Sequence, residues 1–294
     1  MDRLESLEAF VAVTEAGSLT AAAQRLGLSP TMIGKHLRTL EARLGVRLIT
    51  RTTRRQSLTE AGELFLERAR RVLREAAEAE DAVATVRGAP AGLLKISAPI
   101  SFGVARLAPA LAAFMAAYPK VEVELSLSDT RSDAVGDGFD VAFRVGPLPD
   151  SGLIARPLGP YRMVVCAAPA YVAAQGEPAT PYDLEAHRCL GLTHWGLRHA
   201  WRFDGPDGGI EVPIQYRLRI DSGPALRAAA LAGAGIIRQP EALVGEDIAQ
   251  GRLVALLPAY DLPARPLYLV YPPDRTPTAK QRVFIDFALA QFAA

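Results

Sequence analysis

The chain has 294 residues, of which 50% are hydrophobic, and its 33 Lys and Arg residues nearly balance its 32 Asp and Glu residues, for a net charge of +1. This length is enough for two or three compact units. No apolar run approaches the about 18 residues of a membrane span, and the N-terminus lacks the apolar core of a signal peptide, so we expect a cytoplasmic protein with no membrane partner.

The first 28 residues predict two helices. Apolar residues at positions 4, 7, 10 and 11 mark an amphipathic first helix. Ser18 can cap a short second helix, whose alanines at 21–23 are small enough for close packing and which ends at Gly27.

A third helix follows after a tight turn. Ser29 is a good N-cap, Pro30 suits the first helical position, and Gly45 supplies the left-handed residue that often ends a helix. We expect one apolar stripe to be buried: Ile33, Leu37, Leu40 and Leu44. The opposite face carries Thr31, Lys35, Arg38 and Ala42. Two short helices joined by a glycine turn predict a helix-turn-helix whose second helix enters the major groove of DNA.

Basic residues are concentrated around this motif. Between Arg25 and Arg55 there are eight basic residues and one acid, Glu41, so this segment carries +7 and the rest of the chain −6. Val46–Leu58 alternates apolar and basic positions, which predicts a two-stranded wing that brings arginines to phosphates or the minor groove. The residues that we predict to bind double-stranded DNA are Ser29, Pro30, Thr31, Lys35, His36, Arg38, Arg51, Arg54 and Arg55. The alternative is a small helical subdomain with a solvated basic face.

A long helix is predicted for residues 59–87, which are rich in Ala, Glu, Arg and Leu. Its apolar stripe is too long for one face of a short domain, and a second copy of the helix is the simplest partner to bury it. The dimerisation residues that we predict are Leu64, Phe65, Val72, Leu73 and Val83. The segment GAPAG at 88–92 then ends the helix.

From residue 93 onward, short apolar runs alternate with helical stretches. Strands are predicted at LLKISA, VEVELSLS and DVAFRVG, with a helix at 104–117, and a second unit of the same kind starts near residue 161. PLYLVYPP at 266–273 is a further strand, and 276–292 a final helix. This alternation predicts an α/β architecture with mainly parallel sheets.

The segment GSLTAAAQRLGLSPTMIGKHLRTLEARLGVRLITRTTRRQSLTEAG resembles the LysR-type family of bacterial transcriptional regulators, as do GLLKISAPISFG, DGFDVAFRVG and the run from 221 to 257. The resemblance implies an α+β chain: a winged helix-turn-helix domain at 1–59, a linker and dimerisation helix at 60–88, and an effector-binding domain at 89–294. That domain would have two α/β lobes like a periplasmic binding protein, lobe I at 92–161 plus 267–294 and lobe II at 162–266.

The resemblance also implies partners: promoter DNA, a small-molecule effector, a homodimer or homotetramer, and RNA polymerase as a further candidate. One departure concerns the recognition helix, where Gly34 stands at a position that is usually Ser in the family. Lys35 and His36 likewise stand where Arg and Gln are more usual.

Open parallel sheets bind ligands beyond the carboxyl ends of their strands. The effector residues selected by this rule are Ser97, Ser101, Phe102, Ser128, Asp129, Arg144, Gly146, His194, Trp195, Ser222 and Arg238. Each has a structural alternative, since Ser and Asp at strand ends also cap helices and Arg144 can pair with a neighbouring carboxylate. Arg238 favours an anionic ligand such as an organic acid, and the alternative is an internal salt bridge to Glu241 or Asp221.

The sequence does not favour an enzyme. It contains no GxSxG, HExxH, P-loop or GxGxxG motif, and its four histidines are scattered without the spacing of a metal site, so we predict no catalytic residue, metal or cofactor. Cys166 and Cys189 form no CxxC motif and are expected to be buried small apolar residues rather than a redox pair. We therefore expect a LysR-type transcriptional regulator, and the main alternative is a DNA-organising protein that needs no ligand.

Overall fold

The computed structural model describes residues 2–51, 56–86, 90–129, 138–148, 152–193, 200–206, 208–273 and 277–293. The chain divides into two compact units, Met1–Ala89 and Pro90–Ala294.

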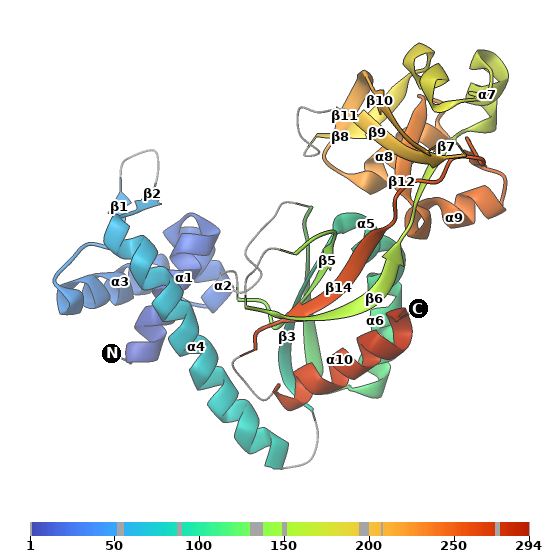
Figure 1. The fold of residues 1–294 in the computed structure, drawn as a ribbon. Helices are drawn as coiled ribbons and strands as arrows, with labels where there is room; N and C mark the ends of the chain where they lie inside the picture. Colours follow the sequence, from blue (N-terminus) through green and yellow to red (C-terminus); the bar gives the residue numbers. More distant parts are fainter. Residues whose placement is uncertain are drawn as a thin grey trace. The chain divides into compact units, whose positions relative to one another are not determined.

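The N-terminal unit is a helical bundle with a small hairpin (Figure 1). Its elements are α1 (Arg3–Ala16), α2 (Leu19–Leu26), α3 (Pro30–Leu44), β1 (Ile49–Arg51), β2 (Gln56–Leu58) and α4 (Glu60–Val86). The predicted caps are confirmed: the hydroxyls of Ser18 and Ser29 accept hydrogen bonds from backbone N–H groups of α2 and α3, and Gly27 and Gly45 end these helices in the left-handed region. Leu44 is 39% exposed, so the buried stripe of α3 ends earlier than predicted, at Leu40.

The predicted wing is the antiparallel pair β1–β2. Glu41, the single acid of the basic segment, accepts hydrogen bonds from the N–H groups of Leu48 (2.9 Å) and Ile49 (3.2 Å), which fixes the start of β1 against α3. Gly62 allows α4 to pass close by, because a Cβ there would lie 2.1 Å from the Leu48 carbonyl oxygen. The hairpin is thus held by both helices.

The first lobe of the C-terminal unit is a five-stranded sheet in the order β4-β3-β5-β14-β6. Helices α6 and α10 cover one face, where an aromatic core includes Phe114, Phe143 and Phe284. The elements are β3 (Gly92–Ala98), α5 (Ile100–Phe102), the π-helix η1 (Gly103–Leu107), α6 (Ala108–Ala117), β4 (Val121–Leu127), β5 (Val141–Val145), β6 (Ile154–Tyr161), β14 (Arg265–Tyr271) and α10 (Ala279–Phe292).

The second lobe is a five-stranded sheet in the order β11-β8-β12-β7-β13, covered on both faces. Helices α8 and α9 pack on one face through Leu226 and Val244, and the hairpin β9–β10 packs on the other through Trp201 and Val212. The elements are β7 (Met163–Ala167), α7 (Pro169–Gln175), the 3-10 helix η2 (Pro181–Ala186), β8 (Cys189–Leu192), β9 (Ala200–Gly205), β10 (Gly208–Pro213), β11 (Tyr216–Ile220), α8 (Gly223–Leu231), β12 (Ile236–Pro240), α9 (Glu241–Ala249) and β13 (Val254–Ala255).

The expectation of mainly parallel sheets is corrected by the strands that connect the lobes. β3 pairs in parallel with β4 and β5, and β8 pairs in parallel with β11 and β12. By contrast, β14 runs antiparallel to β5 and β6, and β7 runs antiparallel to β12 and β13. The chain leaves the first sheet along β6 to enter the second at β7, and returns along β14, so these strands reverse direction relative to their neighbours (Figure 1).

The helical stretch Ile100–Ala117 is, by length and composition alone, apolar enough to cross a membrane. In the fold, Phe102, Leu107, Leu111 and Phe114 of this stretch are buried in the core of the first lobe. Its hydrophobicity therefore has a packing explanation.

Candidate DNA interface and effector site

The predicted outer face of α3 is exposed at Thr31, Lys35 and Arg38. Ser29 and Pro30 are exposed at the start of the same helix, where the Ser29 hydroxyl accepts the Met32 N–H at 3.2 Å. The structure therefore brings five of the predicted DNA-binding residues together on the accessible face and N-terminus of one helix.

His36 is an exception and corrects the prediction. Its side chain is only 2% exposed, and its Nδ1 lies 3.5 Å from the hydroxyl of Ser6 on α1. A buried imidazole in contact with α1 cannot reach DNA from this position, so His36 packs α3 against the rest of the unit.

The wing is only partly described. Arg51 lies in β1, but its side chain is outside the described part of the chain, as are Arg54 and Arg55 altogether. Their contacts with DNA stay a prediction.

The apolar residues of α4 face two directions. Phe65 and Leu73 pack against the core of the N-terminal unit, and the Phe65 ring lies 5.6 Å from that of Phe10. Leu64 and Val72 are 68% and 46% exposed. The single dimerisation stripe predicted from the sequence is therefore corrected: Phe65 and Leu73 belong to the fold of their own chain, and the side chain of Val83 is outside the described residues.

Several predicted effector residues have structural partners in the first lobe. Arg144 Nη1 donates to the Ser97 hydroxyl at 3.1 Å, and Ser97 itself is buried. Asp129 accepts the Ile100 N–H at 3.0 Å, so it caps the start of α5, and the Ser128 N–H donates to the Ala98 carbonyl at 3.0 Å. These contacts hold the loops at the carboxyl ends of β3 and β4.

Phe102 lies in the aromatic core, with its ring 5.0 Å from Phe143 and 5.2 Å from Phe292. It is 3% exposed, so most of its ring surface packs within the first lobe. It does line a hollow of about 630 Å³ between η1, β6 and α9, whose rim carries Arg106, Arg162 and Glu241. Among the predicted effector residues that the structure describes, only Phe102 lines this hollow.

Gly146 lies beside a second arginine, Arg265 at the start of β14. Gly146 has a φ of +93°, and a Cβ there would lie 2.5 Å from Arg265 Nη2. Burial raises the pKa of the nearby Tyr161 above its usual range, and the charge of Asp129 raises it further, while Arg265 opposes this shift. Tyr161, Asp129 and Arg265 are therefore electrostatically coupled in the first lobe.

Arg238 lies on the face of β12 that the β9–β10 hairpin covers. Its guanidinium lies over the Trp201 ring, 5.3 Å from the centroid, and Trp201 Nε1 donates to the Tyr216 hydroxyl at 2.8 Å. Burial lowers the pKa of Arg238 to about 10, and the positive charge of Arg265 also lowers it. Arg238 therefore still carries its positive charge at neutral pH, and it is repelled by the positive charge of Arg265.

Gln239 is a polar residue of the site that the sequence analysis missed. It is 1% exposed, and among the described residues neither Oε1 nor Nε2 of its side chain has a hydrogen-bond partner. A Cβ on Gly223 would lie 2.2 Å from Ser101 Oγ and 2.9 Å from Gln239 Oε1, so these groups meet where α5 of the first lobe faces the start of α8. Gln239 and Arg238 thus point to opposite faces of β12, as alternation along a strand requires.

Ser222 lies on the same side of β12 as Gln239. Its hydroxyl caps α8 at 3.4 Å from the Ala225 N–H, next to Gly223 and Ser101. His194 and Trp195 lie outside the described residues. The structure therefore brings Ser101 and Ser222 together on one side of β12, while Arg238 lies on the other.

Two family models match the chain. The bacterial regulatory helix-turn-helix protein of the lysR family matches residues 4–63, and the LysR substrate binding domain matches residues 87–293. The chain belongs to the LysR family of transcriptional regulators.

Known LysR-type regulators resemble it along nearly their whole length. PtxR of Pseudomonas aeruginosa is 40% identical over 96% of this chain and 91% of its own. The solved structure of CrgA, a LysR-type transcriptional regulator from Neisseria meningitidis, is 35% identical, covers 99% of both chains and has a TM-score of 0.66. The full-length structure of AphB, a Vibrio cholerae virulence activator, is 28% identical over 99% of this chain and all of its own, with a TM-score of 0.69. This LysR-type regulator therefore joins a helix-turn-helix domain to an effector-binding domain.

The two cysteines of this LysR-type regulator are both buried. Burial raises the pKa of Cys166 and of Cys189 to about 12 each. Since the thiolate is the reactive form, we expect both thiols to resist alkylation by iodoacetamide in the native protein at pH 8 and to react once guanidinium chloride unfolds it. Mass spectrometry of the two samples measures this, and rapid labelling of either cysteine in the native protein would contradict it.

Replacing the buried Gln239 with an apolar residue should stabilise the protein, because its amide has no hydrogen-bond partner among the described residues. A buried polar group without a hydrogen bond costs about 1–3 kcal/mol, so Gln239→Leu should raise the free energy of unfolding by about 1 kcal/mol. Urea unfolding followed by circular dichroism measures the change. Gln250→Leu is the control, because Gln250 is exposed, donates to Glu246 at 2.8 Å and offers no such gain. A lower stability for Gln239→Leu would show that the amide is bonded after all.

Proposed function

We propose that this LysR-type regulator binds promoter DNA as a homodimer or homotetramer and changes that binding when a small organic acid occupies its effector domain. The row of Thr31, Lys35 and Arg38 on the accessible face of α3 supports the DNA-binding part. Side chains at the start of a recognition helix contact base edges, while basic residues of a wing contact phosphates or the minor groove.

Lys35 is the residue that we expect to read a base near the start of α3. Lys35→Ala should weaken binding to the specific duplex by about 1–3 kcal/mol, with a smaller effect on random DNA. Fluorescence anisotropy with both duplexes measures the two losses. Lys120→Ala, which removes an exposed lysine from the C-terminal unit, is the control and should change neither. Equal losses on both duplexes would make Lys35 a phosphate contact.

The exposed apolar residues of α4 support self-association. Leu64 and Val72 are eight positions apart, which places them on the same side of a helix, and Ala79 continues this exposed row. Large exposed side chains at this spacing are typical of a helix that packs against another helix. The partner that we propose is α4 of a second copy.

The organic-acid part rests on Arg238 and Arg265. Burial is the main cause of the lowered pKa of Arg238, and the positive charge of Arg265 adds to it, so an anion placed beside Arg238 would stabilise its buried charge.

Calorimetric titration of the full-length protein with acids and their matched amides, such as benzoate and benzamide, tests this class of effector. We expect acids to bind at least tenfold more tightly than amides, and Arg238→Leu to remove the difference in a variant whose circular dichroism is unchanged. Amides that bind as tightly as acids, with no effect of Arg238→Leu, would remove Arg238 from the site.

A further inference from the structure

Gly34 is an unexplained feature of the recognition helix. It is the fifth residue of α3, and glycine in a helix interior is less stable than alanine. Its φ is not in the left-handed region that would require glycine, since it is absent from the positive-φ glycines of the described chain. A Cβ at this position would meet only Arg38 Nη1, at 3.6 Å, which is an ordinary contact distance. Neither the backbone nor the packing of the free protein therefore requires glycine here.

The contact with Arg38 shows where the arginine side chain lies. Helical side chains lean toward the N-terminus, and the guanidinium of Arg38 lies back over the turn that contains Gly34. Gly34 is buried, whereas Thr31, Lys35 and Arg38 around it are exposed. The guanidinium is thus held against the bare backbone of the N-terminal half of α3.

This position distinguishes two roles for Arg38. An arginine directed toward the C-terminal end of a recognition helix suits the phosphate backbone, but the N-terminal half is the part that reaches base edges. The guanidinium fork matches O6 and N7 of guanine, the commonest specific arginine contact in the major groove. We propose that Arg38 reads a guanine in the major groove from this position over the N-terminal half of α3. The proposal rests on α3 entering the major groove, as proposed above.

The test uses the full-length protein and a duplex selected by the wild type from a randomised library. Each guanine of the selected duplex is replaced in turn by 7-deazaguanine, which lacks the N7 acceptor. We expect wild-type binding to fall about tenfold or more at one guanine, and Arg38→Lys, which keeps the charge but loses the fork, to be insensitive to the replacement at that same position. Arg43→Lys, on the exposed C-terminal part of α3, is the matched control and should keep the wild-type pattern.

Gly34→Ala is a second control. Its Cβ would lie 3.6 Å from Arg38 Nη1, an ordinary contact distance, so the variant should fold with a thermal midpoint equal to or above that of the wild type and keep the wild-type discrimination. Equal sensitivity of wild type and Arg38→Lys at every guanine would overturn the proposal, because it would make Arg38 a phosphate contact. If no duplex is selected at all, the proposed DNA function fails before this proposal is reached.

Discussion

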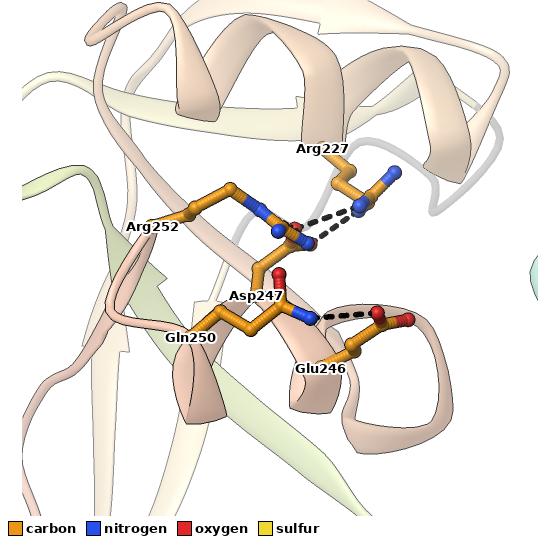
Figure 2. Close-up of polar contacts among 5 residues, drawn as sticks. All are labelled: Arg227, Glu246, Asp247, Gln250 and Arg252. Carbon is orange, nitrogen blue, oxygen red and sulfur yellow. Dashed lines mark hydrogen bonds and ion pairs between the residues drawn. The ribbon is translucent and has the colours of Figure 1, made fainter.

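Asp247→Asn is expected to destabilise the effector domain by about 3 kcal/mol, because the Asp247 carboxylate is fully buried between two arginines. Arg227 on α8 donates to both of its oxygens, and Arg252, which follows α9, donates to Oδ1 at 2.7 Å (Figure 2). Removing the negative charge leaves two guanidinium groups facing each other. The two side chains are 33% and 44% exposed, so water screens part of their repulsion, and we expect the lower end of the range for buried ion pairs.

Glu246→Gln is the matched control for this prediction. Glu246 precedes Asp247 on the same helix, but it is exposed and accepts only the Gln250 amide at 2.8 Å among the contacts drawn in Figure 2. Its replacement should change stability by less than about 0.5 kcal/mol. Urea unfolding of both variants measures the difference, and equal effects would contradict the assigned role of Asp247.

The stability that Asp247 contributes through Arg227 and Arg252 should depend on pH. Hydrogen bonds from Arg227 and then Arg252 lower the pKa of Asp247 in the folded protein. A lowered folded pKa gives stability that is fully present above the ordinary carboxyl pKa, about 3.9, and is lost as pH falls through the folded value. The gap between wild type and Asp247→Asn should therefore be constant at neutral pH and shrink below about pH 4.

Replacing both Leu64 and Val72 with Glu should break the proposed contact between two α4 helices. Each change removes apolar burial and places a charge in the contact, for a total cost on the order of 3–5 kcal/mol. Light scattering should then show lighter particles than the wild type, and specific DNA binding should weaken because two linked recognition helices bind more tightly than one.

The choice of these two residues follows from their exposure. Leu73, which the sequence assigned to the same stripe, packs against the core of its own unit, so a charge there would unfold the unit rather than separate subunits. Glu67→Gln, at an exposed position of α4, is the control and should keep the parent mass. A double variant that is folded by circular dichroism and keeps the parent mass and affinity would place the interface elsewhere.

The elements with strong local signals could be predicted from the sequence. Ser29, Pro30 and Gly45 mark both ends of α3 because capping depends on residues next to each other in the chain. The hairpin β9–β10 was missed, although Gly205 and Gly208 at its turn are a typical hairpin signal. The antiparallel direction of β14 could not be derived from the pattern of residues, because it depends on the chain returning from the second lobe to the first.

The errors at the site have a related cause. The period of α4 identifies an apolar helix, but only the position of Phe10 on α1 determines that Phe65 faces inward. His36 and Gln239 were detectable in principle. His36 lies close to the stripe of Ile33 and Leu40 around α3, and Gln239 shares one face of β12 with the buried Ile237. In both cases the polar character of the residue obscured its buried position.

The most direct test of a ligand-responsive DNA-binding regulator measures DNA binding by the full-length protein with and without ligands. A duplex selected from a randomised library is compared with its scrambled sequence at one salt concentration, with and without a panel of organic acids. We predict binding to the selected duplex at least about 10³-fold tighter than to the scrambled one, and at least one acid that changes the specific affinity but not the non-specific affinity. Equal affinity for both duplexes, or specific binding that no acid changes, would contradict a ligand-responsive regulator and favour a DNA-organising protein.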